Sequence, residues 1–300
     1  MGLGTPVVTI GNFDGVHRGH RAVLWRAREI ADRGAHDVVA VTFDPHPMAV
    51  LRPDHAPAML TSLPVRAELL GEAGVDDVLA LPFSREIAAW SPVEFVDRVL
   101  VGALRASVVV VGGNFRFGSR AAGDVALLRE VGQQRGFAVE GIALDGGPQV
   151  WSSTYVRTCL GEGDVAGAAE ALGRPFSVGG VVVEGDRRGR QLGYPTANVP
   201  LAAGTAAPAD GVYAGWLRHR GSGERWPAAI SVGTNPTFAG ERDRRAEAYA
   251  LDRDDLELYG VEVEVAFVER LRGMTAFDDA EALLETMADD VRRTRAVLAT

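Results

Sequence analysis

The sequence predicts an α/β protein of two domains, in which a parallel sheet is followed by an antiparallel β-barrel and a terminal helix. The chain has 300 residues, a length at which two domains are the usual outcome. Its first half alternates near-continuous apolar strands with helices, which is typical of a parallel sheet covered on both faces. Beyond residue 175, short strands follow one another between glycine-rich and charged turns, which favours an antiparallel barrel or sandwich.

The first half contains predicted strands separated by helices. The strands are expected at 6–11, 37–43, 107–112 and 137–144, and the helices at 20–34, 91–100 and 124–134. The helix at 91–100 begins with a capping box, with Ser91 as N-cap, Pro92 at N1 and Glu94 at N3. In parallel sheets ligands bind beyond the carboxyl ends of the strands, so the residues that follow each strand are candidates for a site.

The second half of the sequence has a different order of predicted strands and helices. Strands are expected at 177–185, 211–219, 226–233, 246–252 and 261–268, and a helix at 277–298. A short helix ends at Gly173, before Arg174 and Pro175, and this is where a link between domains is expected. The predicted domains are therefore 1–172 and 173–300.

Composition excludes several classes of protein. The net charge of -9 argues against a protein that holds nucleic acid through a broad basic face. The single cysteine, Cys159, cannot form an internal disulfide. The N-terminus lacks the basic and apolar regions of a signal peptide, and no apolar run approaches the ~18 residues of a membrane span. We expect a cytoplasmic protein that does not engage membranes.

The basic residues are informative because all 31 of them are arginine. A Walker A phosphate loop requires a lysine, and a Schiff-base enzyme requires an amine. The sequence excludes both kinds of site.

Residues 11–20, GNFDGVHRGH, form the first candidate site. Gly11 allows a tight turn after the first strand, and Gly15 and Gly19 allow the backbone to approach a ligand closely. His17 and His20 fall at the start of a helix, where free N–H groups and the helix dipole favour phosphate oxygens. Two imidazoles there could hold a triphosphate and stabilise a leaving pyrophosphate. The alternatives are a structural loop with incidental histidines, or a zinc site shared with the cluster at 44–46.

Other polar clusters follow other predicted strands. TFDPHP occupies 42–47, GGNFRFG occupies 112–118, and SSTYVR occupies 152–157. Ser152, Ser153 and Thr154 offer hydroxyls at a helix start, and Arg157 can bind a phosphate with two parallel hydrogen bonds. A plain N-cap is the alternative interpretation of SSTYVR.

Residues 179–198 form the second candidate site. Glycines at 179, 180, 185 and 189 can expose backbone N–H groups to an anion. Thr196 and Asn198 would share one face of a strand, and their oxygens suit Mg²⁺ better than zinc. Glu247 in AEAYALD could deprotonate a hydroxyl nucleophile. The alternatives are a simple strand start after Pro195 and an exposed strand glutamate.

The motifs at 11–20, 42–47, 114–118 and 152–157 resemble, in this order, the adenylyltransferase module of bacterial bifunctional riboflavin kinase/FAD synthetases. The resemblance implies a Rossmann-like nucleotidylyltransferase domain, in which FMN attacks the α-phosphate of ATP to give FAD and pyrophosphate. His17 and His20 would act in catalysis by binding the triphosphate. The nucleotide-binding residues that it implies are Gly11, Phe13, Asp14, Gly15, His17, His20, Asn114, Ser153, Thr154 and Arg157.

The second half resembles the riboflavin kinase module of the same family, through GGVVVEGDRRGRQLGYPTAN, GVYAG, SVGTNPTF, the Glu247 segment, LYG and the spacing of Arg272 and Phe277. The resemblance implies transfer of the ATP γ-phosphate to the riboflavin 5′-hydroxyl. Thr196 and Asn198 would hold Mg²⁺ with ATP, Glu247 would be the base, and further nucleotide contacts would come from Gly180, Gly185 and Arg190. Two positions depart from the usual pattern, since Tyr249 and Glu257 stand where histidine and aspartate are frequent.

We therefore expect an enzyme that uses ATP, riboflavin and FMN, acting as a monomer or weak homo-oligomer. One rival is a flavin- or nucleotide-binding module without catalysis, which the complete set of candidate catalytic residues argues against. The other is an enzyme with a single activity, or one that adenylylates another small phosphate ester. The product of the predicted kinase half is the substrate of the first half, which argues against that rival.

Overall fold

The computed structural model describes residues 5–143, 151–185, 193–234, 244–275, 277 and 279–299. Contacts divide the chain into two compact units, Met1–Ser153 and Thr154–Thr300. The predicted boundary at residues 172 and 173 stays a prediction. In the described ranges, no helix combines the length and the apolar character needed to cross a membrane.

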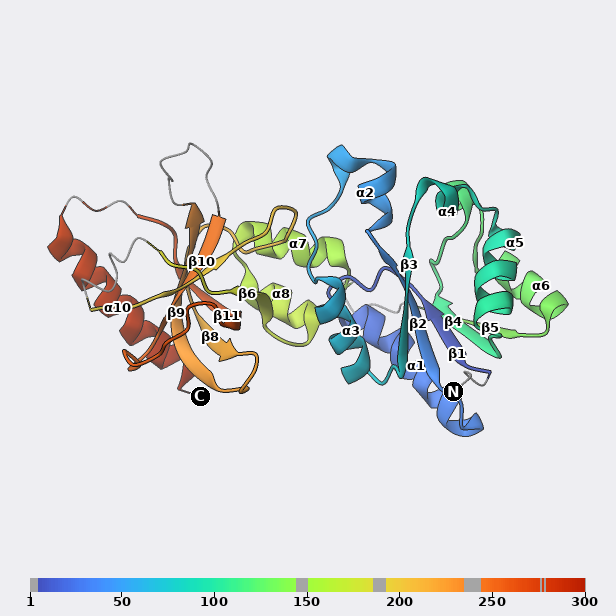
Figure 1. Ribbon diagram of the computed structural model, residues 1–300, viewed down its shortest axis with the longest axis horizontal. Helices are drawn as coiled ribbons and strands as arrows, with labels where there is room; N and C mark the ends of the chain where they lie inside the picture. Colours follow the sequence, from blue (N-terminus) through green and yellow to red (C-terminus); the bar gives the residue numbers. More distant parts are fainter. Residues whose placement is uncertain are drawn as a thin grey trace. The chain divides into compact units, whose positions relative to one another are not determined.

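The first unit is built on a five-stranded parallel sheet with strand order β3-β2-β1-β4-β5 (Figure 1). Its strands are β1 (Val7–Ile10), β2 (Val38–Asp44), β3 (Asp77–Pro82), β4 (Val108–Gly112) and β5 (Ala138–Ile142). Strand β3 is not among the strands predicted from the sequence. This edge strand is only half-buried along its length, so it lacks the continuous apolar run that marks β1 and β4.

Helices cover both faces of this sheet. They are α1 (Arg18–Gly34), α2 (Pro47–Leu51), α3 (Leu63–Glu72), α4 (Arg85–Ala89), α5 (Pro92–Phe95), η2 (Val96–Ala103, a π-helix) and α6 (Val125–Arg135), with short 3-10 turns η1 (Pro53–His55) and η3 (Ser119–Ala121). Ser91 caps α5 as predicted, since its hydroxyl accepts a hydrogen bond from the Glu94 N–H at 3.1 Å. The Glu94 carboxylate pairs instead with Arg98 at 2.8 Å.

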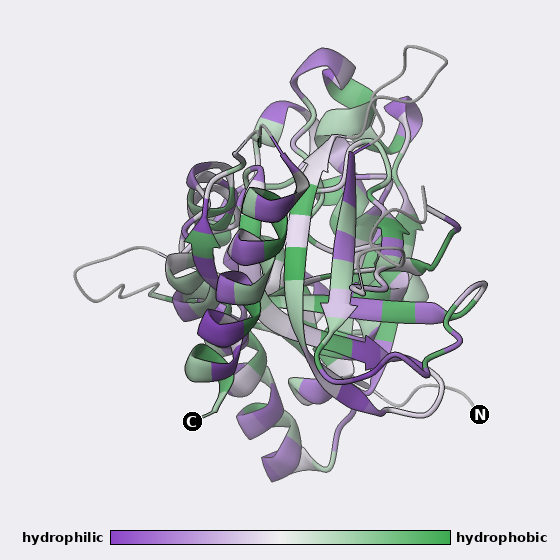
Figure 2. Ribbon diagram, turned by 90° about the vertical axis from the view of Figure 1, so that its left-hand side faces the viewer, coloured by the Kyte–Doolittle hydropathy of each residue, from purple (hydrophilic) through white to green (hydrophobic). Residues whose placement is uncertain are grey.

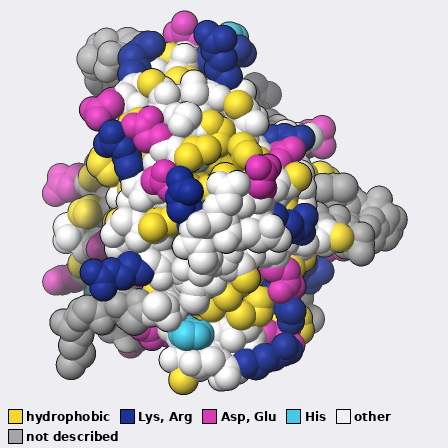
Figure 3. Space-filling view, turned by 90° about the vertical axis from the view of Figure 1, so that its right-hand side faces the viewer, with side chains coloured by type: hydrophobic (Ala, Val, Ile, Leu, Met, Phe, Trp, Pro, Cys, Tyr) yellow, Lys and Arg dark blue, Asp and Glu magenta, His cyan; other side chains and the backbone are white. Residues whose placement is uncertain are grey.

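Alternate residues of the strands supply two separate cores. Val8, Val39 and Val109 pack with η2 and α6 on one face. Val7, Val38 and Val110 pack with α1 and α3 on the other face. This double burial explains the near-continuous apolar strands of the sequence. On the face of the molecule shown in Figure 3, arginine and acidic side chains lie interspersed.

The second unit contains a six-stranded antiparallel sheet with strand order β6-β11-β8-β9-β10-β7. The strands are β6 (Phe176–Val181), β7 (Ala197–Pro200), β8 (Gly211–His219), β9 (Arg225–Thr234), β10 (Arg244–Ala250) and β11 (Glu262–Arg272). Helices α7 (Ser153–Glu162) and α8 (Val165–Leu172) precede them, and Gly173 ends α8 with a φ of 73°. A bridge between Val183 and Asn198 links the segment after β6 back to β7, so the sheet nearly closes into the predicted barrel.

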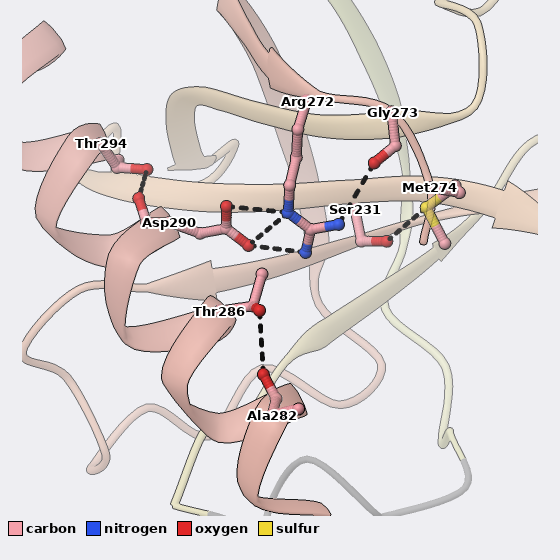
Figure 4. A network of polar contacts seen from close by, with 8 residues as sticks. All are labelled: Ser231, Arg272, Gly273, Met274, Ala282, Thr286, Asp290 and Thr294. Atoms are coloured by element: carbon pink, nitrogen blue, oxygen red, sulfur yellow. Dashed lines mark hydrogen bonds and ion pairs between the residues drawn. The ribbon is translucent and has the colours of Figure 1, made fainter. Parts of the chain in front are cut away.

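Helix α10 (Ala280–Leu298) ends the chain and packs against β8, β9 and β11. Hydrophilic and hydrophobic residues alternate along it in Figure 2, as expected for a helix that covers a sheet with one face. A bidentate ion pair fastens it to β11. Arg272 Nε and Nη2 donate to Asp290 Oδ1 and Oδ2 at 3.0 and 2.7 Å, and the Asp290 side chain is only 6% exposed (Figure 4).

Candidate functional site

The strand order of the first unit places its candidate residues at one edge of the sheet. β1 lies between β2 and β4, so the chain that runs outward through β2 and β3 returns to the other side of β1. Ligands bind at such a switch point, beyond the carboxyl ends of the strands. The loop at 11–17 follows β1, the turn that contains Asn114 follows β4, and His46 follows β2. Asn12 Nδ2 lies 3.2 Å from His46 Nε2, which links the segments after β1 and β2.

The loop at 11–17 has an unusual backbone. Phe13 and Val16 have φ values of 48° and 41°, a region that side chains with a Cβ rarely adopt, and Gly15 has a φ of 83°. Such strain concentrates at functional sites, where the surrounding structure holds it in place. The neighbouring glycines make room. A Cβ at Gly11 would lie 3.1 Å from the Phe13 ring, and one at Gly19 would lie 3.1 Å from the His17 ring.

Asp14 fixes this loop through buried hydrogen bonds. The residue is 1% exposed, and its carboxylate accepts hydrogen bonds from the backbone N–H of Leu60 at 3.0 Å and of Thr61 at 3.0 Å. The Thr61 hydroxyl lies 3.2 Å from Asp14 Oδ1 and 3.1 Å from the Gly15 nitrogen. From the other side, the Ser153 hydroxyl donates to the Asp14 carbonyl at 2.9 Å. These contacts give Asp14 and Ser153 a role in fixing the loop, and their predicted nucleotide contacts stay predictions.

His17 and His20 lie together at the start of α1. His17 is the N-cap, its Nδ1 accepts from the His20 N–H at 3.3 Å, and the two rings stack with centroids 3.6 Å apart. Because Nδ1 accepts this bond, a neutral His17 ring carries its proton on Nε2 and can donate from there. Burial, with His17 and Arg66 as further causes, holds the pKa of His20 well below its usual value. His20 Nδ1 is buried and has no hydrogen-bond partner within the described residues.

Arg66 is a residue of this site that sequence reasoning missed. It lies on α3, is 2% exposed, and donates to Thr42 Oγ1 at 3.1 Å and to the Phe43 carbonyl at 3.2 Å. Thr42 in turn donates to the Asn12 carbonyl at 3.0 Å, so the guanidinium supports the loop after β1. Burial lowers the pKa of Arg66, and the negative charges of Asp14 and Asp44 oppose this effect. An arginine in a short helix gives no sequence signal that it will be buried.

Other predicted residues of this site are less closely joined to the loop. Asn114 is exposed in the turn after β4. Thr154 and Arg157 lie in the first turns of α7 and belong to the second unit, so their contacts with the loop stay predictions. Within the ranges that the structure describes, no group of three or more His, Cys, Asp or Glu side chains could hold a metal ion. The zinc alternative therefore gains no support from the described residues.

The second unit contains a cavity of about 670 Å³ that gathers the other candidates. Thr196, Asn198, Glu247 and Gly185 all line it. The register of the strands explains this grouping, because Glu247 on β10 lies opposite Asn198 on β7 and opposite Ser231 on β9. The sequence AEAYA therefore turns its alanines into the core, while Glu247 points to the cavity and is half-buried.

Asn198 is 6% exposed, and its Nδ2 donates to the Thr196 carbonyl at 3.2 Å and lies 3.4 Å from Thr196 Oγ1. Gly185 passes directly over this amide, since a Cβ there would lie 2.6 Å from Asn198 Nδ2. Gly180 has a different environment, because its Cβ would meet Val199 Cγ1 at 2.9 Å. Its nucleotide contact stays a prediction, and Arg190 lies outside the described residues.

Apolar and aromatic residues complete the cavity wall. They include Met274, Leu283, Tyr259 and Leu256. The Ser231 hydroxyl donates to Met274 Sδ at 3.9 Å. Met274 lies two residues after Arg272, which pairs with Asp290 (Figure 4). Tyr249, at the position where histidine is frequent, packs edge-on against Tyr194 at 5.1 Å. Burial raises the pKa of Tyr249 above its usual value.

Comparisons with known proteins find matches for both halves of the chain. A family model for FAD synthetase matches residues 3–153, and one for riboflavin kinase matches residues 172–298. The bifunctional riboflavin kinase/FMN adenylyltransferase of Escherichia coli K12 is 40% identical over 287 residues, covering 95% of this chain and 90% of that protein. The protein of the same name from Pseudomonas fluorescens is 40% identical over 296 residues, covering 98% and 93%. A crystal structure described as a macrolide-efflux protein from Streptococcus pneumoniae has a TM-score of 0.88 at 31% identity, covering 98% of this chain and 95% of that one.

The fold and the two matching domain families define a two-domain transferase of flavin cofactor synthesis. The chain belongs to the bifunctional riboflavin kinase/FMN adenylyltransferase family. Both parts of the predicted fold class, and the resemblance drawn from the motifs, are thereby confirmed.

Proposed function

We propose that the cavity of the second unit binds riboflavin and ATP, and that Glu247 accepts the proton of the riboflavin 5′-hydroxyl as the γ-phosphate is transferred. The observation that carries this proposal is the position of Glu247 opposite Asn198, inside a cavity large enough for a small molecule. A carboxylate on a strand is held rigidly, as a base must be to stay within reach of one hydroxyl. The transfer itself then needs positioning and charge neutralisation more than covalent chemistry.

Thr196 and Asn198 are the residues that would hold Mg²⁺ with ATP. Their side chains offer neutral oxygen ligands of the kind that Mg²⁺ prefers, and the two side chains lie together at the cavity wall. Bound Mg²⁺ would neutralise charge on the phosphates. Asn198 is buried and held by Thr196, so its orientation is set before any ligand arrives.

The first unit is proposed to adenylylate FMN. His17 and His20, with the N–H groups at the start of α1, would hold the ATP triphosphate while the FMN phosphate attacks the α-phosphorus and pyrophosphate leaves. The support is an N-cap histidine that can donate from Nε2, beside a second imidazole whose buried Nδ1 has no hydrogen-bond partner among the described residues. Asp14, Ser153 and Arg66 would keep the loop in its strained conformation. Asn114, Thr154 and Arg157 would contribute further nucleotide contacts.

As a member of its family, the chain has riboflavin kinase and FMN adenylyltransferase activities and makes FAD from riboflavin and ATP. A cytoplasmic location and a monomeric or weakly oligomeric state remain predictions of the sequence.

A two-product assay tests the function. Purified protein is incubated with riboflavin, ATP and Mg²⁺, and the flavins are separated by chromatography. We expect FMN and then FAD. FMN alone would contradict the assignment of the first unit, and neither product would favour the binding-module alternative.

A further inference from the structure

Arg245 is a cationic residue of the cavity that neither the motifs nor the proposed mechanism uses. It lies on β10 two positions before Glu247, so both side chains point to the same face of the strand, about 7 Å apart along it. Arg245 is half-buried and lines the cavity with Glu247. Its neighbours across the sheet are Gly233 and Pro200, which offer no polar side chain to bind it.

The other arginines nearby are engaged. Arg244 donates to Asp210 at 2.8 Å, and Arg253, which also lines the cavity, pairs with Asp255 at 2.6 Å. For Arg245 the structure gives no hydrogen bond or ion pair among the described residues. The remaining charged side chains of the described cavity wall are acidic, namely Glu247, Asp254 and Glu257. Positive charge in the cavity would stabilise a bound triphosphate, and in a chain without lysine the side chains that carry a permanent positive charge are arginines.

We propose that the Arg245 guanidinium binds the phosphoryl group that passes from ATP to riboflavin. This inference rests on the proposed kinase site. In the transfer, the bond from the 5′-oxygen to the γ-phosphorus forms while the bond from that phosphorus to the β,γ-bridging oxygen breaks. The hydroxyl proton moves to Glu247, and ADP leaves. A planar guanidinium can donate two parallel hydrogen bonds to the phosphoryl oxygens, first on ATP and then on FMN.

The position of Arg245 relative to Glu247 suits this role. The group that receives the proton and the group that neutralises the phosphoryl charge project from one rigid strand, on the same face. Met274 lies beside the same end of the cavity, with its methyl group 3.6 Å from where a Gly233 Cβ would be. An arginine whose role was to contact the flavin ring would occupy the same region. The experiment distinguishes contact with the flavin ring from binding of the phosphoryl group.

The test compares Arg245→Gln and Arg245→Lys with the wild type, and uses Arg218→Gln as a matched control. Arg218 is a half-exposed arginine on β8, outside the described cavity wall, that pairs with Glu264. Kinase activity is the sum of FMN and FAD formed from riboflavin, and FAD formation from added FMN reports separately on the first unit. We expect Arg245→Gln to lower the kinase kcat roughly 10- to 100-fold with the KM for riboflavin unchanged, because charge stabilisation in the transition state is lost. Arg245→Lys should be intermediate, and Arg218→Gln should match the wild type.

Chemical rescue adds a readout that a purely structural role would not produce. Millimolar guanidinium chloride should restore part of the kcat of Arg245→Ala and leave the wild type unchanged. An unaltered kcat in Arg245→Gln and Arg245→Lys would overturn the inference, as would a rise confined to the KM for riboflavin. If the glutamine variant does not fold, the lysine variant and the rescue decide. A wild-type protein that forms no FMN would instead overturn the proposed kinase function.

Discussion

Glu247 lies directly opposite Asn198 across the antiparallel strands β10 and β7, and both side chains line one cavity. The register of β10 against β7 determines which side chains face the cavity. A slip of one residue would turn Glu247 into the core and an alanine towards the cavity. The small alanines on the core side fix the register, because a charged side chain there would have no partner.

We expect Glu247→Gln to lower FMN formation at least about 100-fold, because the amide cannot accept the hydroxyl proton. FAD formation from added FMN should continue at the wild-type rate, since it takes place in the other unit. Chromatographic assays of both steps check this, with the exposed Glu262→Gln on β11 as control. Loss of both activities in a well-folded Glu247 variant would argue against two separate sites.

Gly185→Ala should impair the kinase with little effect on folding. The new Cβ would lie 2.6 Å from Asn198 Nδ2, and the side-chain amide is the part that can move. Displacing it disturbs the proposed Mg²⁺ and ATP ligands, so we expect the KM for ATP to rise roughly tenfold, as for a lost contact of about 1.4 kcal/mol. Steady-state kinetics at several Mg²⁺ concentrations measures this effect. Gly161→Ala on α7, where a Cβ meets nothing within 4 Å, is the control.

Replacing both His17 and His20 with alanine should abolish FAD formation and leave FMN formation intact. The two rings stack at the start of α1, and their loss removes the imidazole donors proposed for the triphosphate. The assay starts from FMN for the first activity and from riboflavin for the second. Undiminished FAD production by the double variant would refute the proposed adenylyltransferase site.

The buried imidazole of His20 makes the stability of the first unit depend on pH. In the unfolded chain His20 binds a proton near its ordinary pKa of 6.5, whereas the folded protein keeps a pKa well below that value. Well above pH 6.5 the ring is neutral in both states, so His20 does not change the free energy of unfolding there. As the pH falls below 6.5, the unfolded state binds the extra proton, so the free energy of unfolding decreases until the pH reaches the lower folded pKa.

Thermal unfolding between pH 8 and pH 5 measures this dependence. His20→Gln, which does not titrate, should show a shallower decline than the wild type across the acidic part of that range. Parallel curves for the two proteins would mean that His20 contributes nothing to the pH dependence.

Asp290→Ala should destabilise the second unit by about 2–3 kcal/mol, because it leaves the partly buried Arg272 guanidinium without its carboxylate. Urea unfolding and hydrogen exchange of α10 measure the loss. Asp289→Ala, at the neighbouring exposed position, should cost less than about 0.5 kcal/mol. Since Met274 follows Arg272 closely, the Asp290 variant should also raise the KM for riboflavin.

Features that depend on neighbouring residues could be predicted from the amino-acid sequence. Alternation of apolar strands with helices predicted the parallel sheet, and short strands between turns predicted the antiparallel one. The capping pattern predicted Ser91, and the start of α7 was expected within residues 152–157. Turn glycines and a helix start likewise identified the loop at 11–20, because backbone conformation and capping are local properties.

Which distant residues share a site depends on the three-dimensional fold. Strand order placed the turns after β1 and β4 side by side, and strand register placed Glu247, Asn198 and Ser231 in one row. Burial of Arg66 near the loop, and the place of Arg245 in the cavity wall, followed from the same long-range packing. Short-range periodicity carries no information on which strands pair or which arginine becomes buried, because both depend on contacts between segments far apart in the chain.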